Sequence, residues 1–206
     1  MNNKPLIKAS GFGTHDYCEW KWYLENVLGE EIPTTKEMAK GAQVHQEKED
    51  KFLEVATPTT VEKFLASTKY TITKEIPLKK EFKDFLLVGK VDELAVDQSN
   101  VYVIDDKPNA RPWLGTKRQI WAYCLLFKGN FPKIHKKIIA ILRDRDTDAE
   151  VWQKDFDAAD EKQIIDVMER MNKLFRKEIE PMPCTHPNKC RACVLHKEGK
   201  CLHSCA

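Results

Sequence analysis

The chain has 206 residues, 42% of them hydrophobic, and its 34 basic and 32 acidic side chains leave a formal net charge of only +2. A chain of this length buries about two-thirds of its unfolded surface in one core, so we expect a single domain over residues 1–206, and the small charge excludes binding of nucleic acid through overall charge. No window is long and apolar enough for a signal peptide or a membrane span, so we expect a cytoplasmic protein without membrane contact.

Residues 1–69 are predicted to form an N-terminal helical part. Thr14 can cap a helix that continues through Leu28, because aromatic and apolar residues recur there at helical spacing and Gly29 ends the run. Two further helices are predicted over residues 35–52 and 60–67.

From residue 70 to residue 180 the pattern indicates an α/β core. Alternation and β-branched residues predict strands, and helical spacing returns twice. The predicted strands cover residues 70–78, 85–96, 101–107, 137–143 and 151–156, with the last two paired, and the predicted helices cover 117–127 and 158–177. Pro181 and Pro183 then open a cysteine-rich tail, residues 181–206, which has no periodicity and needs a metal to be ordered.

Two carboxylates and a lysine come together in this predicted sheet. The two-residue period of a strand places Asp105 and Lys107 on one face. A four-residue hairpin loop at 97–100 would pair Asp92 with Asp105. The same register pairs Val96 with Val101 and Leu94 with Val103.

Opposed carboxylates destabilise a sheet unless a cation lies between them, and an oxygen-rich site suits Mg²⁺ or Mn²⁺. Such a metal can activate water and polarise a phosphate, while Lys107 orients the water or neutralises developing charge. The pattern therefore indicates phosphodiester hydrolysis. The alternative is that Asp92 and Asp105 end their strands in solvent and that Lys107 is a salt-bridge partner.

Four short motifs follow one another along the chain: Gly41-x-x-x-His45, Gly89-x-x-Asp92, Asp105-x-Lys107 and Gln119-x-x-x-Tyr123. Cys18, placed shortly before Tyr23 and Leu24, adds to the series. This order resembles the RecB-like branch of the PD-(D/E)XK nucleases. The resemblance implies an α/β fold, a restriction-endonuclease-like core in which helices flank a mixed sheet, with a metal-binding cysteine-rich C-terminal tail.

The resemblance also implies roles for individual residues. His45, Asp92 and Asp105 would bind the metal through their side chains and Asp106 through its backbone carbonyl. Asp92, Asp105 and Lys107 would form the catalytic set. Gln119 and Tyr123, one helical turn apart, would lie beside the site and contact DNA. Glu75 is a weaker candidate, which we interpret as structural.

Five of the seven cysteines follow Pro183, and a reducing compartment disfavours disulfides. Cys190-x2-Cys193-x7-Cys201, with Cys18 far upstream, resembles the one-plus-three pattern of the iron–sulfur nucleases of this branch, which include the CRISPR-associated Cas-four proteins and exonuclease V. Four thiolates would hold a [4Fe–4S] cluster. The alternative is a structural Zn²⁺ site. Its ligands would be Cys184, Cys190, Cys193 and Cys201, or a mixture that includes His186, His196 or His203.

Two cysteines remain beyond these sets. Cys205 is extra in both readings, and either it or Cys184 could replace a proposed cluster ligand. Cys124 lies within a predicted helix and is expected to be a buried apolar residue.

The sequence thus predicts a metal-dependent deoxyribonuclease, an exonuclease on single-stranded or end-containing DNA. The contexts implied are CRISPR adaptation, with proteins of that system as partners, viral DNA processing, or repair. The alternative function is a non-catalytic DNA-binding or partner-docking module stabilised by a zinc or iron–sulfur centre.

Overall fold

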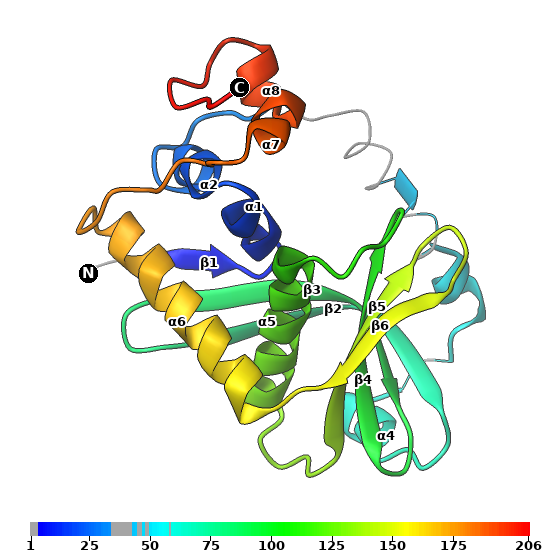
Figure 1. Ribbon diagram of the computed structural model, residues 1–206. Helices are drawn as coiled ribbons and strands as arrows, with labels where there is room; N and C mark the ends of the chain where they lie inside the picture. The colour runs from blue at the N-terminus through cyan, green and yellow to red at the C-terminus, as the bar shows by residue number, and fades with distance from the viewer. Residues whose placement is uncertain (1–3, 34–42, 45–46, 48–49, 58) are drawn as a thin grey trace.

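The computed structural model describes residues 4–33, 43–44, 47, 50–57 and 59–206 (Figure 1). Its strands are β1 Leu6–Lys8, β2 Thr71–Glu81, β3 Leu86–Val96, β4 Asn100–Lys107, β5 Lys137–Asp144 and β6 Glu150–Asp155. Its helices are α1 Gly11–Tyr17, α2 Glu19–Asn26, α4 Val61–Leu65, α5 Leu114–Asn130, α6 Ala158–Phe175, α7 Pro187–Ala192 and α8 Val194–Lys197. No helix of the described ranges is long and apolar enough to cross a membrane.

The strands form one mixed six-stranded sheet in the order β1-β3-β4-β5-β6, with β2 on the other edge of β3. β3 pairs antiparallel with β2 and β4, whereas β4 and β5 are parallel and are joined through α5. The expected mixed sheet flanked by helices is therefore present. The short strand β1, parallel to β3, was not predicted.

The predicted register between β3 and β4 is confirmed where the two strands form their ladder. Val96 pairs with Val101 and Leu94 with Val103. Asp97 closes the hairpin, because its Oδ1 accepts hydrogen bonds from the backbone N–H groups of Ser99 and Asn100, both at 2.8 Å. The predicted pairing of β5 with β6 is also confirmed.

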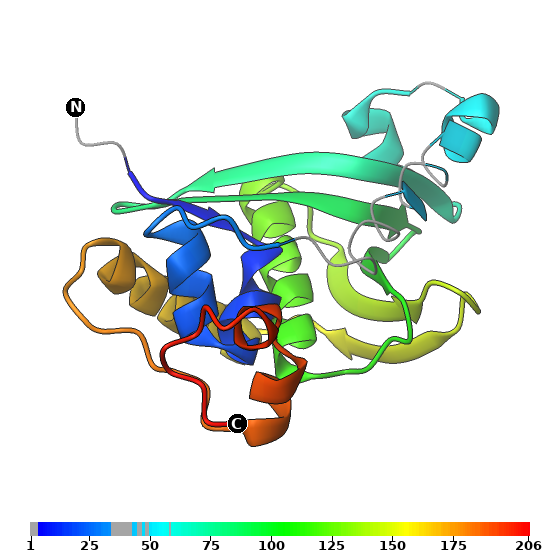
Figure 2. The ribbon, with the colours of Figure 1, turned by 90° about the horizontal axis from the view of Figure 1, so that it is seen from above.

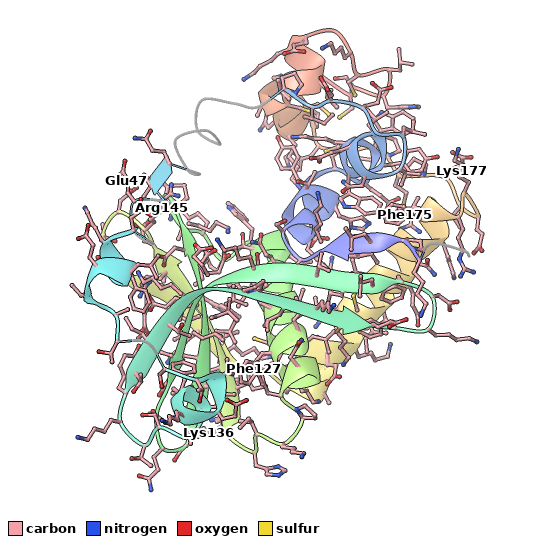
Figure 3. All side chains as sticks on the ribbon, turned by 180° about the vertical axis from the view of Figure 1, so that it is seen from behind. Glu47, Phe127, Lys136, Arg145, Phe175 and Lys177 are labelled. Atoms are coloured by element: carbon pink, nitrogen blue, oxygen red, sulfur yellow. The ribbon has the colours of Figure 1, made fainter. Side chains whose placement is uncertain are left out.

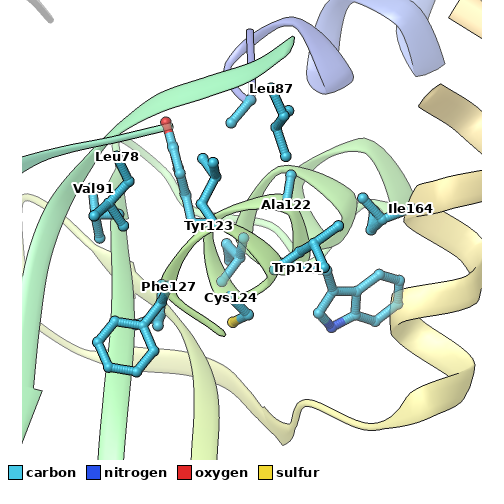
Figure 4. Close-up of a cluster of buried hydrophobic side chains, with 14 of the residues drawn as sticks. Leu78, Leu87, Val91, Trp121, Ala122, Tyr123, Cys124, Phe127 and Ile164 are labelled. Carbon is cyan, nitrogen blue, oxygen red and sulfur yellow. The ribbon is translucent and has the colours of Figure 1, made fainter. Parts of the chain in front are cut away.

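Helix α5 is the centre of the hydrophobic core and lies between the sheet and α6 (Figures 1 and 4). Trp121 lies on its α6 side with Ile164, and Tyr123 lies on its sheet side (Figure 4). The contact with β3 is close at Gly89, where an added Cβ would lie 2.7 Å from Tyr123. Cys124 is fully buried in this core, as predicted.

The prediction of one helix from Thr14 to Leu28 is wrong, because the helix breaks at Cys18. That residue is extended, with φ −161° and ψ 111°, and separates α1 from α2. Helical spacing on both sides of the break hides it in the sequence. Most of the helix predicted over 35–52 lies outside the described residues, although residues 50–55 are helical. The helix predicted over 60–67 is the shorter α4, capped by Thr60.

The tail is more regular than its sequence indicates. It contains α7, which begins with Pro187 in its first turn, and α8. Both lie beside α1 and α2 (Figures 1 and 2). Tyr17 of α1 donates a hydrogen bond of 2.6 Å to the carbonyl of Lys189, which joins the two ends of the chain.

Candidate active site and cysteine cavity

Asp92 and Asp105 lie together where β3 and β4 meet under α5. One residue beyond the end of the ladder between these strands, Asp92 Oδ2 accepts a hydrogen bond of 3.0 Å from the backbone N–H of Asp106. Asp105 is completely buried. The sheet therefore places the two predicted carboxylates side by side.

The two oxygens of Asp105 have different surroundings. Its Oδ1 accepts from Lys107 Nζ at 2.8 Å and from Gln119 Nε2 at 3.1 Å. Its Oδ2 is buried and has no hydrogen-bond partner among the described residues. A buried acceptor left in this way costs free energy that a cation ligated by the oxygen would offset. The donor set therefore fits a hard divalent metal.

The charges of the site reinforce this interpretation. Burial, and then the charge of Asp105, raises the pKa of Asp92 to about 7. Burial acts to lower the pKa of Lys107, but the charges of Asp105 and Asp92 outweigh it and hold that pKa above its ordinary value. The site thus concentrates negative charge that one lysine only partly compensates.

Gln119 and Tyr123 lie beside the carboxylates, but they are buried, with 7% and 4% of their surface exposed. Gln119 Nε2 contacts both Asp105 and, at 3.3 Å, the Tyr123 hydroxyl. Burial raises the pKa of Tyr123. The ring of Tyr123 is enclosed by Gly89 and the core, so a base cannot stack on it. Contact of Gln119 and Tyr123 with DNA stays a prediction.

Asp106 points to the opposite face of the sheet. Its carboxylate accepts from Arg143 Nε at 2.7 Å and from Arg143 Nη2 at 3.1 Å, and the same guanidinium binds Glu93. These three buried or half-buried side chains join β3, β4 and β5 directly behind the candidate active site. The ion-pairing role of Arg143 was not predicted, because nothing in its neighbourhood marks the partner strand.

Glu75 was interpreted as structural, but it lies near enough to the candidate site for its charge to act on Asp92. Its φ of +56° is in the left-handed region, although it stands in the middle of β2. Its side chain is 12% exposed and forms an ion pair of 2.6 Å with Lys90. Its charge adds to the effects that raise the pKa of Asp92.

His45, the third predicted side-chain ligand, lies outside the described residues. Within the described part of the chain, no three His, Cys, Asp or Glu side chains are gathered closely enough to hold a metal ion as they stand.

A second cluster lies between α1, α2 and the tail. Cys18, Cys190, Cys193 and Cys201, the four predicted cluster ligands, all line one small, partly open cavity. Cys184 lines it as well, and the Sγ atoms of Cys190 and Cys205 are 3.4 Å apart. Cys18, at the break between α1 and α2, lines this cavity.

The buried carboxylate of Glu19 in α2 binds both α6 and the start of the tail. Glu19 accepts from Arg170 Nε at 2.6 Å and Nη2 at 2.7 Å, and from the backbone N–H of Met182 at 2.8 Å. Burial acts to raise the pKa of Glu19, but the hydrogen bonds from His15, Arg170 and Met182 lower it to about 2. These contacts hold α2 against α6 and the start of the tail, beside the cavity.

The sequence matches no protein-family model and no curated protein. Solved structures do resemble the fold. The structure of SSO0001 has a TM-score of 0.56 and 14% identity, over 100% of this chain and 90% of the other. A protein of Eubacterium rectale, provisionally named an exonuclease, has a TM-score of 0.54 and 12% identity, over 97% of this chain and 90% of the other. At these identities the likenesses show a shared mixed α/β fold.

Proposed function

We propose that this protein is a metal-dependent deoxyribonuclease. The observation that carries the proposal is the buried Asp105, whose Oδ2 lacks a hydrogen-bond partner in the described chain while Asp92 and Lys107 lie against the same site. The provisional name of the E. rectale protein of the same fold supports it.

Asp92 and Asp105 would hold Mg²⁺ or Mn²⁺, with His45 and the carbonyl of Asp106 as further ligands. When bound, the metal supplies Lewis acidity to the scissile phosphate and to the attacking water. Lys107 orients that water or neutralises the charge that builds on the phosphate, and Gln119 holds Asp105 in position through its Oδ1. The substrate we propose is DNA that is single-stranded or has free ends, in CRISPR adaptation, viral DNA processing or repair.

The cysteine cavity would hold a [4Fe–4S] cluster through Cys18, Cys190, Cys193 and Cys201. Their common cavity supports this set, and Cys184 in the same cavity is a further thiol ligand available to it. The alternative occupant is a structural Zn²⁺, for which His196 and His203 also line the cavity. In either case the centre holds the first helices to the tail.

The test is cleavage of single-stranded DNA with Mn²⁺ or Mg²⁺ and with EDTA. Asp105→Ala should reduce the rate to background, and Lys107→Ala should reduce it by about 100- to 1000-fold. Asp155→Ala, which removes an exposed carboxylate from the ion pair with Lys137, is the matched control and should leave the rate unchanged.

Cleavage that survives in both site variants would contradict the proposal. Tight DNA binding by the wild-type protein without metal-dependent cleavage would instead support the alternative, a non-catalytic DNA-binding module.

A further inference from the structure

An exposed stretch of chain leads from the end of β4, which carries Lys107, into helix α5. It consists of Arg111, Pro112, Trp113 and Leu114 and starts four residues after Lys107. Trp113 is 71% exposed, the highest value for any aromatic side chain that the structure describes, and Leu114 is 49% exposed. Exposing so large an apolar ring forgoes the stabilisation that its burial would give, so its position needs an explanation.

The stretch is held firmly in place. Ala110, just before it, is buried and donates its backbone N–H to Asp144 Oδ2 at 2.9 Å, which fastens the loop to the end of β5. Trp113 donates its backbone N–H to the carbonyl of Arg111 at 2.8 Å, and its own carbonyl accepts from Lys117 in the first turn of α5. The indole is therefore presented on a backbone that is fixed at the start of α5.

Gln119 follows Trp113 by six positions, a rise of about 9 Å along a helix, and Gln119 contacts Asp105. That length matches about three nucleotides at the ~3.4 Å spacing of a stacked strand, and fewer in an extended one. Lys136 and Arg145, labelled in Figure 3, mark the two ends of β5. The loop that carries Trp113 is attached to β5 at the Arg145 end, through Ala110 and Asp144.

Basic residues precede and follow Trp113 in the chain. Arg111, two positions before it, is exposed, and Lys107 and Lys117 are partly exposed. Lys117 Nζ lies 5.4 Å from the centre of the Trp152 ring. A flat aromatic surface with cations beside it suits a base and its phosphates, and sites for single-stranded nucleic acid combine the same two features.

We propose that Trp113 is a stacking platform for one base of an unpaired DNA strand, and that Arg111 contacts a neighbouring phosphate. The proposal rests on the proposed nuclease function for the identity of the ligand. It gives the site a preference for single strands, because the bases of a duplex are already stacked on one another and do not offer a free face to the indole.

The test measures binding without cleavage. A fluorescein-labelled oligothymidylate is titrated with protein in EDTA and followed by fluorescence anisotropy. Trp113→Ala should raise the dissociation constant about 5- to 150-fold, and Trp113→Phe should restore most of the affinity. A blunt duplex should bind both variants and the wild type alike.

Tyr70→Ala is the matched control. Tyr70 is 64% exposed, but it precedes Thr71, which pairs with Val96 at the hairpin end of β4, away from Lys107. This variant should bind the oligothymidylate like the wild type. Melting curves of all variants check that the fold is intact.

Equal affinity of wild type and Trp113→Ala for the oligothymidylate would overturn the proposal. So would an equal loss of duplex binding, which would indicate a general phosphate contact. The result is independent of catalysis. A Trp113-dependent preference for single strands in a protein that cleaves nothing would retain the platform and reject the nuclease.

Discussion

Asp105, Asp106 and Lys107 are consecutive in β4, and their side chains alternate between the two faces of the sheet. Asp105 and Lys107 lie on the α5 side, where the metal and the phosphate are proposed to bind. The side chain of Asp106, between them, lies on the other face and forms the ion pair with Arg143. The residues proposed for catalysis and the residue that forms the supporting ion pair are therefore neighbours in the chain.

We predict that Asp106→Ala destabilises the protein by about 1–3 kcal/mol. The guanidinium of Arg143 keeps Glu93 as a partner, so the loss is smaller than for a charge left with no partner at all. Urea unfolding followed by circular dichroism measures the change. Asp155→Ala should stay within about 0.5 kcal/mol of the wild type. A stability of Asp106→Ala equal to that of the control would mean that the ion pair contributes nothing to the fold.

Asp97 at the β3–β4 hairpin predicts a pH dependence. Hydrogen bonds from Tyr102, and then from the Ser99 and Asn100 backbone, lower the pKa of Asp97 to about 2. Because the pKa of the unfolded chain is higher, at about 3.9, the carboxylate stabilises the fold fully above about pH 5 and loses this effect as the pH falls towards 2. The melting temperature of the wild type minus that of Asp97→Asn should therefore shrink between pH 5 and pH 2. A constant difference over this range would refute the prediction.

At the scale of elements, the contact between β3 and α5 sets the position of the candidate site. A Cβ on Gly89 would approach Tyr123 to 2.7 Å and both Ala9 and Leu126 to 3.0 Å. Since Tyr123 and Gln119 share a hydrogen bond, a shift of the helix at this point reaches Asp105.

We predict that Gly89→Ala destabilises the protein by about 1–3 kcal/mol and also lowers the cleavage rate. Gly13→Ala is the control, because its new Cβ would meet only Gln119, at an ordinary 3.7 Å. Thermal melting and the DNA cleavage assay compare the two variants. Equal behaviour of both would show that the helix and the strand can separate without loss.

The elements that the sequence predicts well are those whose signal is local. Alternation located the strands, and the length of the 97–100 loop was enough to predict the pairing of Val96 with Val101. β1 was missed because three residues carry too short a pattern and pair in parallel with a strand far along the chain.

The candidate site also contains residues with a local sequence signal and residues whose roles depend on distant segments. Asp92, Asp105 and Lys107 could be proposed because one hairpin joins them. The burial of Tyr123 depends on how α5 packs on the sheet, and the role of Arg143 depends on the register between β4 and β5. Neither can be read from the neighbouring residues, since both arise from packing between distant segments.

At the scale of the whole molecule, the cysteine cavity joins α1 and α2 to the tail. We predict that protein prepared without oxygen contains iron and acid-labile sulfide, and that Cys18→Ala loses both together with thermal stability. At this size each kcal/mol lost corresponds to about 2–4 °C in melting temperature. Metal analysis, absorbance and melting curves measure these changes.

Cys124→Ala is the control, because Cys124 is buried in α5 and does not line the cavity. It should keep the full metal content. Colourless protein with one zinc per chain, unaffected by Cys18→Ala, would refute the cluster and leave the nuclease proposal to depend on the carboxylates.

The hydrogen bond from Tyr17 to Lys189 joins residues that are 172 positions apart in the chain. A ribosome adds about 5–20 residues each second, so roughly 10 to 30 seconds pass between the synthesis of Cys18 and that of the cysteines it meets. The α/β core can fold during this interval, whereas the cavity cannot yet exist. The proposed metal centre would therefore be inserted only after the tail has been made, and until then Cys18 would lack its partner thiols.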